Sequence, residues 1–230
     1  MYILYVRHGQ STANFLQMTD PFYFFKLPWY PDAKLSETGV EQASIMSYNI
    51  INMLKLKGLN IVPFIFSSIL SRSIETANII SKVNENILLR PVVIPYIEEV
   101  PLNYYVKNIP IISYINIDLQ NVPRNLYDIL AETIANNDKS NLKFDIIPEL
   151  NPYDKNGSVV STTDIPKFYQ SLDLIRKFIS ESGYKLNDKS VIIIVSHRKT
   201  IQEITGLSVG NLGLVLQKDV YDNEILFDGF

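Results

Sequence analysis

The sequence predicts an α/β fold in which buried strands alternate with amphipathic helices. Segments rich in apolar residues at 2–6, 61–66 and 190–196 have the length and the β-branched and aromatic content of core strands. Between these segments, apolar residues recur at the spacing of a helix face. Strands that alternate with helices are typical of a sheet covered by helices.

Two helices and a further strand are predicted in the first half of the chain. The first helix spans residues 36–57, with Ser36 as its N-cap and Gly58 at its end. Its core positions are Val40, Ala43, Met46, Ile50 and Leu54. The second helix spans residues 71–82 and directs Ile74, Ala77 and Ile80 inward, and a strand is expected over residues 87–95.

The second half begins with the least readable part of the sequence, residues 101–165, where prolines recur and only residues 126–134 resemble a helix. Residues 165–183 then predict a helix that ends at Gly183, with an apolar face formed by Phe168, Leu172, Ile175 and Ile179. The remaining elements are short: a helix at residues 200–205 and strands at residues 212–216 and 224–227.

The chain has two histidines, and each directly follows a predicted core strand. His8 lies in Arg7-His8-Gly9, and His197 lies in Ser196-His197-Arg198. Open α/β sheets bind ligands at the carboxyl ends of their strands, so we predict that the two imidazoles meet in one crevice. Gly9 would let backbone and substrate approach closely. The alternative is that each histidine is a hydrogen-bonded structural residue at a strand end.

Four blocks of residues follow one another along the chain. They are Arg7-His8-Gly9-Gln10-Ser11-x-x-Asn14, Leu35-Ser36-x-x-Gly39-x-x-Gln42-Ala43, Ser68-x-Leu70-x-Arg72-x-x-x-Thr76-Ala77 and Val195-Ser196-His197. Together they resemble the signature of the histidine phosphatase superfamily, the phosphoglycerate-mutase-like group. The resemblance implies a single domain over residues 1–230, a three-layer sandwich with a mostly parallel central sheet flanked by helices. It also implies a cap insertion over about residues 101–165 that sets specificity.

The same resemblance implies a phosphomonoester hydrolase that forms a phosphohistidine intermediate on a small phosphorylated substrate. His8 would be the nucleophile, Glu99 the general acid and base, and His197 a further member of the catalytic group. Glu98, one register away, is the alternative acid. Two other functions remain open: a phosphoglycerate-mutase-type phosphotransferase and an inactive protein that binds a phosphorylated ligand. The stretch after Asn14 lacks the Phe-Thr-Gly-Trp-like segment of the mutases and favours the phosphatases.

Phosphate binding would fall to Arg7, Asn14 and Arg72. A phosphomonoester dianion needs positive charge and several donors, and guanidinium forks match phosphate oxygens. Nearby guanidiniums should also lower the pKa of His8, which must be neutral to attack phosphorus. A hydrogen bond from its other ring nitrogen to a backbone carbonyl would orient the ring.

Composition narrows the range of partners. The formal net charge is -3, so no basic excess attracts nucleic acid or an anionic membrane surface. The chain has no cysteine, which excludes a disulfide framework, a thiolate nucleophile and cysteine-ligated zinc. We expect neither a metal nor another cofactor. No signal peptide or transmembrane segment is recognisable, so we expect a cytoplasmic protein that acts on a small phosphorylated molecule.

Two features of the sequence can each be interpreted in more than one way. Residues 15–32 are rich in aromatic residues and prolines and predict a loop, which either walls the site, packs on the core or forms a homodimer contact. Arg198 and Lys199 stand where the family usually has glycine or another small residue. They either add positive charge to the pocket or point to solvent, and solvent is the preferred interpretation.

Overall fold

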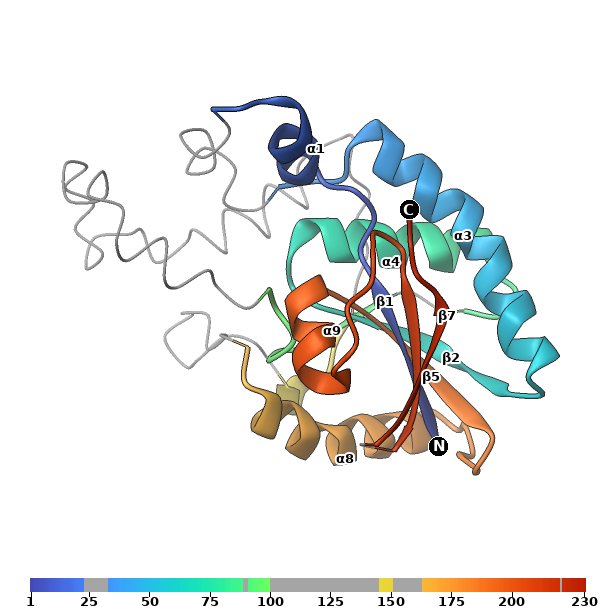
Figure 1. Ribbon diagram of the computed structural model, residues 1–230. Coiled ribbons are helices and arrows are strands. Elements are labelled where there is room, and N and C mark those ends of the chain that lie inside the picture. The colour runs from blue at the N-terminus through green and yellow to red at the C-terminus, as the bar shows by residue number, and fades with distance from the viewer. Residues whose placement is uncertain (23–32, 89–90, 100–144, 151–162, 220) are drawn as a thin grey trace, which may run out of the picture.

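The computed structural model describes residues 1–22, 33–88, 91–99, 145–150, 163–219 and 221–230 (Figure 1). Its strands are β1 (Tyr2–Arg7), β2 (Asn60–Ser67), β3 (Val92–Val93), β4 (Asp145–Ile146), β5 (Ser190–Ser196), β6 (Leu214–Asp219) and β7 (Asp222–Phe227). They form one 7-stranded sheet in the order β4-β3-β2-β5-β1-β6-β7. The strands from β4 to β1 pair in parallel, and β6 and β7 are added antiparallel at one edge. The predicted mostly parallel sheet is therefore confirmed.

The strand β1 lies in the middle of this sheet, between β5 and β6. Its residues pair in parallel with β5, with Tyr2 opposite Val191 and Arg7 opposite Ser196. Every residue of β5 is buried, which explains why the sequence between its terminal serines is continuously apolar rather than alternating. The same register brings the ends of both strands, and the histidines that follow them, to one edge.

Helices cover both faces of the sheet, as the predicted three-layer sandwich requires (Figure 1). The helices α3 (Glu37–Leu56) and α4 (Ser71–Val83) pack on the face formed by Leu4 and Val6. The helices α8 (Ile165–Glu181) and α9 (Arg198–Thr205) pack on the opposite face. A shorter helix, α1 (Thr12–Thr19), follows the loop beyond β1, and the 3-10 helix η2 (Pro148–Leu150) contacts α8.

The predicted ends of the long helices are confirmed. The side chain of Ser36 accepts a hydrogen bond from the backbone N–H of Gly39 and caps α3, and Gly58 follows that helix with φ of 67°. Gly183 has φ of 84° just after α8. Both glycines adopt the left-handed conformation that ends many helices, where a side chain would be strained.

One core prediction in α3 is wrong: Val40 is 45% exposed. The buried stripe of this helix begins at Gly39 and continues through Ala43, Met46, Ile50 and Leu54. Val40 lies one residue off that stripe, which turns its side chain about 100° around the helix axis toward solvent. The pattern was correct from residue 43 onward, and its first member was displaced by one position.

Three elements differ from their predicted bounds. Residues 15–19 belong to α1 rather than to a loop, because Ser11 and Asn14 form a capping box that starts a helix. Among the described residues of the strand expected over 87–95, only Val92–Val93 are in a strand. The helix expected at residues 200–205 begins at Arg198. The predicted helix at 126–134, the aromatic residues from 23 to 32 and most of the expected insertion lie outside the described residues.

No helix in the described part of the chain has both the length and the apolarity that crossing a bilayer requires.

Candidate active site

The loop after β1 is fixed by tight contact with the start of α3. A Cβ atom on Gly9 would lie 2.6 Å from the carbonyl oxygen of Gly39, and one on Gly39 would lie 2.0 Å from that of Gln10. Both glycines are therefore required by the approach of two backbones. Gly9 thus lies against the backbone of α3, and a close approach of substrate at Gly9 stays a prediction. Side chains add to this attachment, since Gln42 accepts from the N–H of Gln10 at 3.0 Å.

This loop holds His8 with a defined orientation of its ring. Nδ1 lies 2.7 Å from the carbonyl oxygen of Gly9, and because a carbonyl only accepts, Nδ1 carries the proton. Nε2 accepts a hydrogen bond from Nε of Arg72 at 3.2 Å. Burial, and next the charge of Arg72, hold the pKa of His8 well below its ordinary value. His8 is thus a neutral imidazole with its Nε2 lone pair directed into the site.

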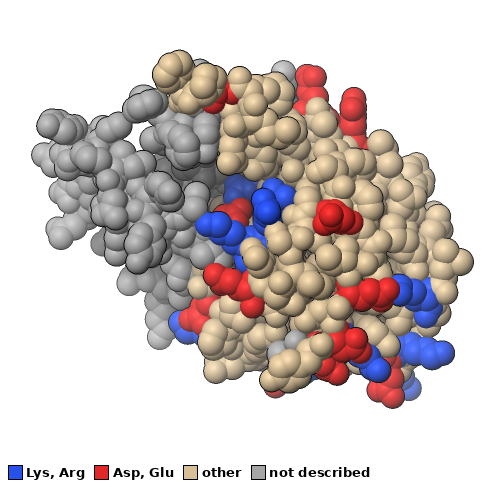
Figure 2. All heavy atoms as spheres, viewed as in Figure 1, with Lys and Arg blue, Asp and Glu red and all other residues tan. Residues whose placement is uncertain are grey.

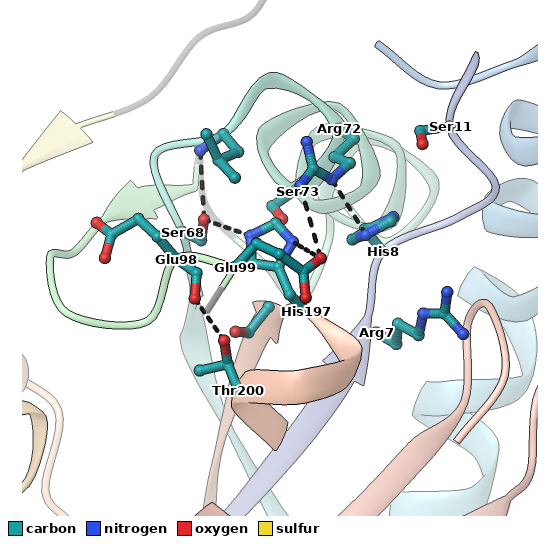
Figure 3. Close-up of polar contacts among 12 residues, drawn as sticks. Arg7, His8, Ser11, Ser68, Arg72, Ser73, Glu98, Glu99, His197 and Thr200 are labelled. Atoms are coloured by element: carbon teal, nitrogen blue, oxygen red, sulfur yellow. Dashed lines mark hydrogen bonds and ion pairs between the residues drawn. The ribbon is translucent and has the colours of Figure 1, made fainter. Parts of the chain in front are cut away.

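Arg72, His197 and Glu99 surround that ring (Figure 3). The rings of His8 and His197 lie with centroids 5.1 Å apart, which confirms that the two imidazoles meet. One carboxylate oxygen of Glu99 lies 3.6 Å from Nη2 of Arg72 and 3.5 Å from Nδ1 of His197. Residues from the ends of β1 and β5, from the first turn of α4 and from the segment after β3 therefore converge on one point.

Two serine hydroxyls lie at the far side of His197. Oγ of Ser68 is 2.8 Å from its Nε2, and Oγ of Ser73 is 3.3 Å away. The Ser68 hydroxyl also accepts from the N–H of Leu70 at 3.3 Å. Burial and then Arg72 lower the pKa of His197 well below its ordinary value. His197 is therefore neutral, with Nε2 beside the two serine hydroxyls and Nδ1 facing the carboxylate of Glu99 at 3.5 Å.

The backbone beside Glu99 is held by hydroxyl groups. The carbonyl of Glu98 accepts from the hydroxyls of Thr163, at 2.6 Å, and of Thr200. The Ser196 hydroxyl donates to the carbonyl of Ile97 at 2.7 Å. Glu99 is one-third exposed, whereas the side chain of Glu98 is buried and extends away from the histidines (Figure 3). The geometry thus brings Glu99 into the site and directs Glu98 elsewhere.

Arg7 and Asn14, the other two predicted phosphate ligands, make their hydrogen bonds at the margin of the site. Arg7 donates from Nη1 to the carbonyl of Val209 at 3.0 Å. Burial lowers the pKa of Arg7 to about 10, with Glu99 opposing that shift, so the guanidinium remains charged at neutral pH. Asn14 uses its amide oxygen to accept from the backbone and hydroxyl of Ser11, at 3.2 and 3.0 Å. A role of Asn14 in binding phosphate stays a prediction.

Basic side chains gather at the mouth of this site. Figure 2 shows a cluster of blue groups around one acidic side chain, beside the part of the surface drawn in grey. The pKa of Arg7 is affected by the charges of Arg72, Arg198 and Glu99, so each of these groups lies within electrostatic range of Arg7. With both histidines neutral, the site has an excess of positive charge and is suited to an oxyanion.

No family model and no curated protein sequence matches the chain. Solved structures do. An ecdysone phosphate phosphatase from Bombix mori, in complex with tungstate, superposes with a TM-score of 0.52 at 13% identity, covering 98% of this chain and 91% of that one. The chain has the histidine phosphatase fold. A mycobacterial glucosyl-3-phosphoglycerate phosphatase gives a TM-score of 0.48 at 16% identity, with 100% and 99% of the two chains covered. A phosphoglycerate mutase from Bacillus anthracis gives 0.45 at 18%, with 99% and 90% covered.

Within this histidine phosphatase fold, several residues of the four sequence blocks support the site without lying in it. The N–H of Gly9 donates to the hydroxyl of Thr76 at 3.1 Å, and Oγ of Ser36 donates to the side chain of Gln10 at 2.8 Å. The amide of Asn211 donates to the carbonyl of His8 at 3.2 Å. Sequence analysis assigns no role to Thr163 or Thr200, because neither belongs to one of the four blocks and a single threonine carries no signal for a partner that is distant in the sequence.

A cation is a poor occupant of this site. His8, Glu99 and His197 each offer an atom, and these atoms lie within 4.8 Å of one another, which matches the ligand number of an open zinc site. However, Nε2 of His8 is the acceptor for Arg72, and that guanidinium also lies 3.6 Å from Glu99. A divalent cation placed there would be repelled by this fixed positive charge. The donor set therefore fits an anion better than a metal ion.

Proposed function

We propose that the chain is a phosphomonoester hydrolase that forms a phosphohistidine on His8 and requires no metal ion or other cofactor. The observation that carries the proposal is the state of the His8 ring, which is neutral, oriented by Gly9 through Nδ1 and open to attack through Nε2. Imidazole must attack phosphorus as the free base, and this ring is held in that form. The ecdysone phosphate phosphatase that shares the fold was solved in complex with tungstate, an oxyanion, which supports the proposal that this fold binds an anion.

The first step transfers the phosphoryl group. As the substrate enters, Arg72 exchanges its hydrogen bond with Nε2 of His8 for phosphate oxygens, and Arg7 adds a second positive charge. Nε2 bonds to phosphorus while the ester P–O bond breaks in line. Glu99 delivers its proton to the leaving oxygen, and the N–H of His197 stabilises charge on the transferred group.

The second step regenerates the enzyme. Glu99, now ionised, takes a proton from water, whose oxygen attacks phosphorus and breaks the P–N bond to His8. The products are the alcohol and inorganic phosphate, and Nε2 recovers its lone pair. A small phosphorylated molecule is the substrate, and the insertion near residues 101–165 would distinguish one such molecule from another.

The test is the hydrolysis of p-nitrophenyl phosphate, with a chelator present, by the wild type and by His8→Ala. We expect turnover and an acid-labile phosphoenzyme in the wild type only. Wild-type-like turnover by His8→Ala would refute the nucleophile. Tight binding of inorganic phosphate without turnover would instead favour a phospholigand-binding protein, and conversion of 3-phosphoglycerate to its isomer a mutase.

Glu99→Gln and Glu98→Gln form a matched pair of neighbouring changes. With an alkyl phosphate, Glu99→Gln should lower kcat by roughly 10²–10⁴, the usual contribution of a general acid, and by less with a phenolate leaving group. Glu98→Gln should retain most of kcat, because its carboxylate extends away from the histidines (Figure 3). The reverse pattern would assign the acid to Glu98.

A further inference from the structure

Arg198 occupies a position at which a positive charge is unfavourable for folding. It is the first residue of α9, directly after His197, so its guanidinium lies at the positive end of the helix dipole. It also lies within electrostatic range of Arg7, whose pKa it lowers. Repulsion from a helix end and from a second guanidinium must be offset, and an anionic ligand would offset both.

Two adjacent residues after α9 accept hydrogen bonds from Arg198 and Arg7. Nε of Arg198 donates to the hydroxyl of Ser208 at 2.8 Å, and Nη1 of Arg7 donates to the carbonyl of the next residue, Val209, at 3.0 Å. The guanidinium groups at the ends of β1 and β5 are thus held by hydrogen bonds to neighbouring residues. Arg198 uses Nε for this bond and is exposed, while Nε–H of Arg7 has no acceptor among the described residues. Donors remain for a bound anion.

The charge count of the site points the same way. Arg7, Arg72 and Arg198 give three positive charges, while both histidines are neutral. Glu99 lies 3.6 Å from Arg72 and offsets part of its charge. Arg7 and Arg198 instead donate to uncharged oxygens, the carbonyl of Val209 and the hydroxyl of Ser208. These two guanidiniums are therefore suited to another negative group on the same molecule.

We propose that Arg198, together with Arg7, binds a second anionic group of the substrate, so that the substrate is a phosphomonoester that also carries a carboxylate or a second phosphate. This inference rests on the proposed phosphate pocket around His8 and Arg72. It assigns Arg198 as a specificity residue that does not take part in the chemistry. An aliphatic phosphate without the second charge binds more weakly.

The experiment is calorimetric titration of the whole chain with two non-hydrolysable probes at constant ionic strength. Methylphosphonate tests the phosphate pocket alone, and phosphonoacetate adds one carboxylate; 3-phosphonopropanoate repeats the comparison with a longer spacer. We expect one of the carboxylated probes to bind roughly 10- to 100-fold more tightly than methylphosphonate, the usual contribution of a charge-assisted hydrogen bond. Arg198→Gln should remove that gain and leave methylphosphonate binding within about threefold.

Arg176→Gln is the matched control, since it removes the same charge from an exposed arginine on α8 that pairs with Asp173 at 2.7 Å. It should keep the full gain. If both carboxylated probes bind wild type no better than methylphosphonate, or if Arg198→Gln retains the gain, the second anion site is wrong. If no probe binds at all, the phosphate pocket is wrong, and the proposed function falls with it.

Discussion

The contact between α3 and the loop after β1 predicts an unusual response to Gly39→Ala. In an ordinary helix this replacement stabilises the protein by up to ~1 kcal/mol. Here the added carbon would lie 2.0 Å from the carbonyl oxygen of Gln10 and 2.9 Å from its carbonyl carbon. Both are backbone atoms, so no change of side-chain rotamer relieves the overlap. Ordinary contact begins at 3.4 Å, so the two backbones must separate by about 1.4 Å.

A separation of this size should destabilise the protein by about 1–3 kcal/mol, the usual cost of overpacking. In a chain of this length each kcal/mol corresponds to roughly 2–4 °C in Tm. Urea unfolding and thermal melting measure the change directly and need no substrate. Val40→Ala, one residue along the same helix but 45% exposed, is the control and should change stability by less than ~0.5 kcal/mol.

The direction of the change in Tm decides whether the described contact between the loop and α3 is correct. An unchanged or raised Tm for Gly39→Ala would show that the loop and the helix are not in contact as described. The same displacement reaches the loop that carries the proposed nucleophile, because Gln10 is two residues from His8. We therefore expect kcat for p-nitrophenyl phosphate to fall by about 10²-fold, the cost of a misplacement near 1 Å.

Three further predictions concern pH, positioning and the core. His8 and His197 are held neutral by burial, so below pH ~6.5 these two side chains take up protons in the unfolded chain but not in the folded one. The free energy of unfolding should therefore fall as the pH decreases, by up to ~1.4 kcal/mol per pH unit for each ring. Urea titrations between pH 7.5 and 5 should show a shallower slope for His8→Gln, and an unchanged slope would contradict the buried neutral ring. Thr200→Val removes a hydroxyl that fixes the backbone carbonyl before Glu99, so kcat should fall by roughly tenfold with an alkyl phosphate and less with an aryl phosphate, while equal losses would argue against a role through Glu99. Tyr5→Phe deletes a buried hydroxyl that donates to Gln217 at 3.0 Å and should cost about 1–3 kcal/mol in urea unfolding, whereas a loss under ~0.5 kcal/mol would mean that water replaces the bond.

The sequence was sufficient for the sheet and the convergence of the histidines, because both follow from local patterns. Residues 2–6 and 191–195 are aliphatic or aromatic at every position, which is typical of strands buried on both faces. The polar residues that end them must then lie at the carboxyl edge of the sheet. The lowered pKa of His8 and its bond to a backbone carbonyl are likewise confirmed. The largest cause of that pKa shift is burial, and the arginines come after it.

Other features depended on contacts between distant segments. Val40 has the apolarity of a core residue, and only the packing of Gly39 against Gln10 shows which side of the helix turns inward. The helix α1 was not predicted because the aromatic residues and prolines after it dominate the pattern, although Ser11 and Asn14 form a capping box at its start. The hydroxyl of Thr200 that holds the acidic segment is 102 residues from its partner, so no local signal could reveal it.

The position of β1 in the sheet constrains how the protein can be made. Of the described strands, β1 leaves the ribosome before the others, and it pairs with residues 190–196 and 214–219, so neither of these pairings can form until most of the residues described here have been made. During that time an apolar segment with unpaired backbone is exposed to other nascent chains. Closing loops of such length also slows folding relative to proteins whose early contacts are local. Production of this protein should therefore benefit from slow translation or from chaperones that shield the amino-terminal segment.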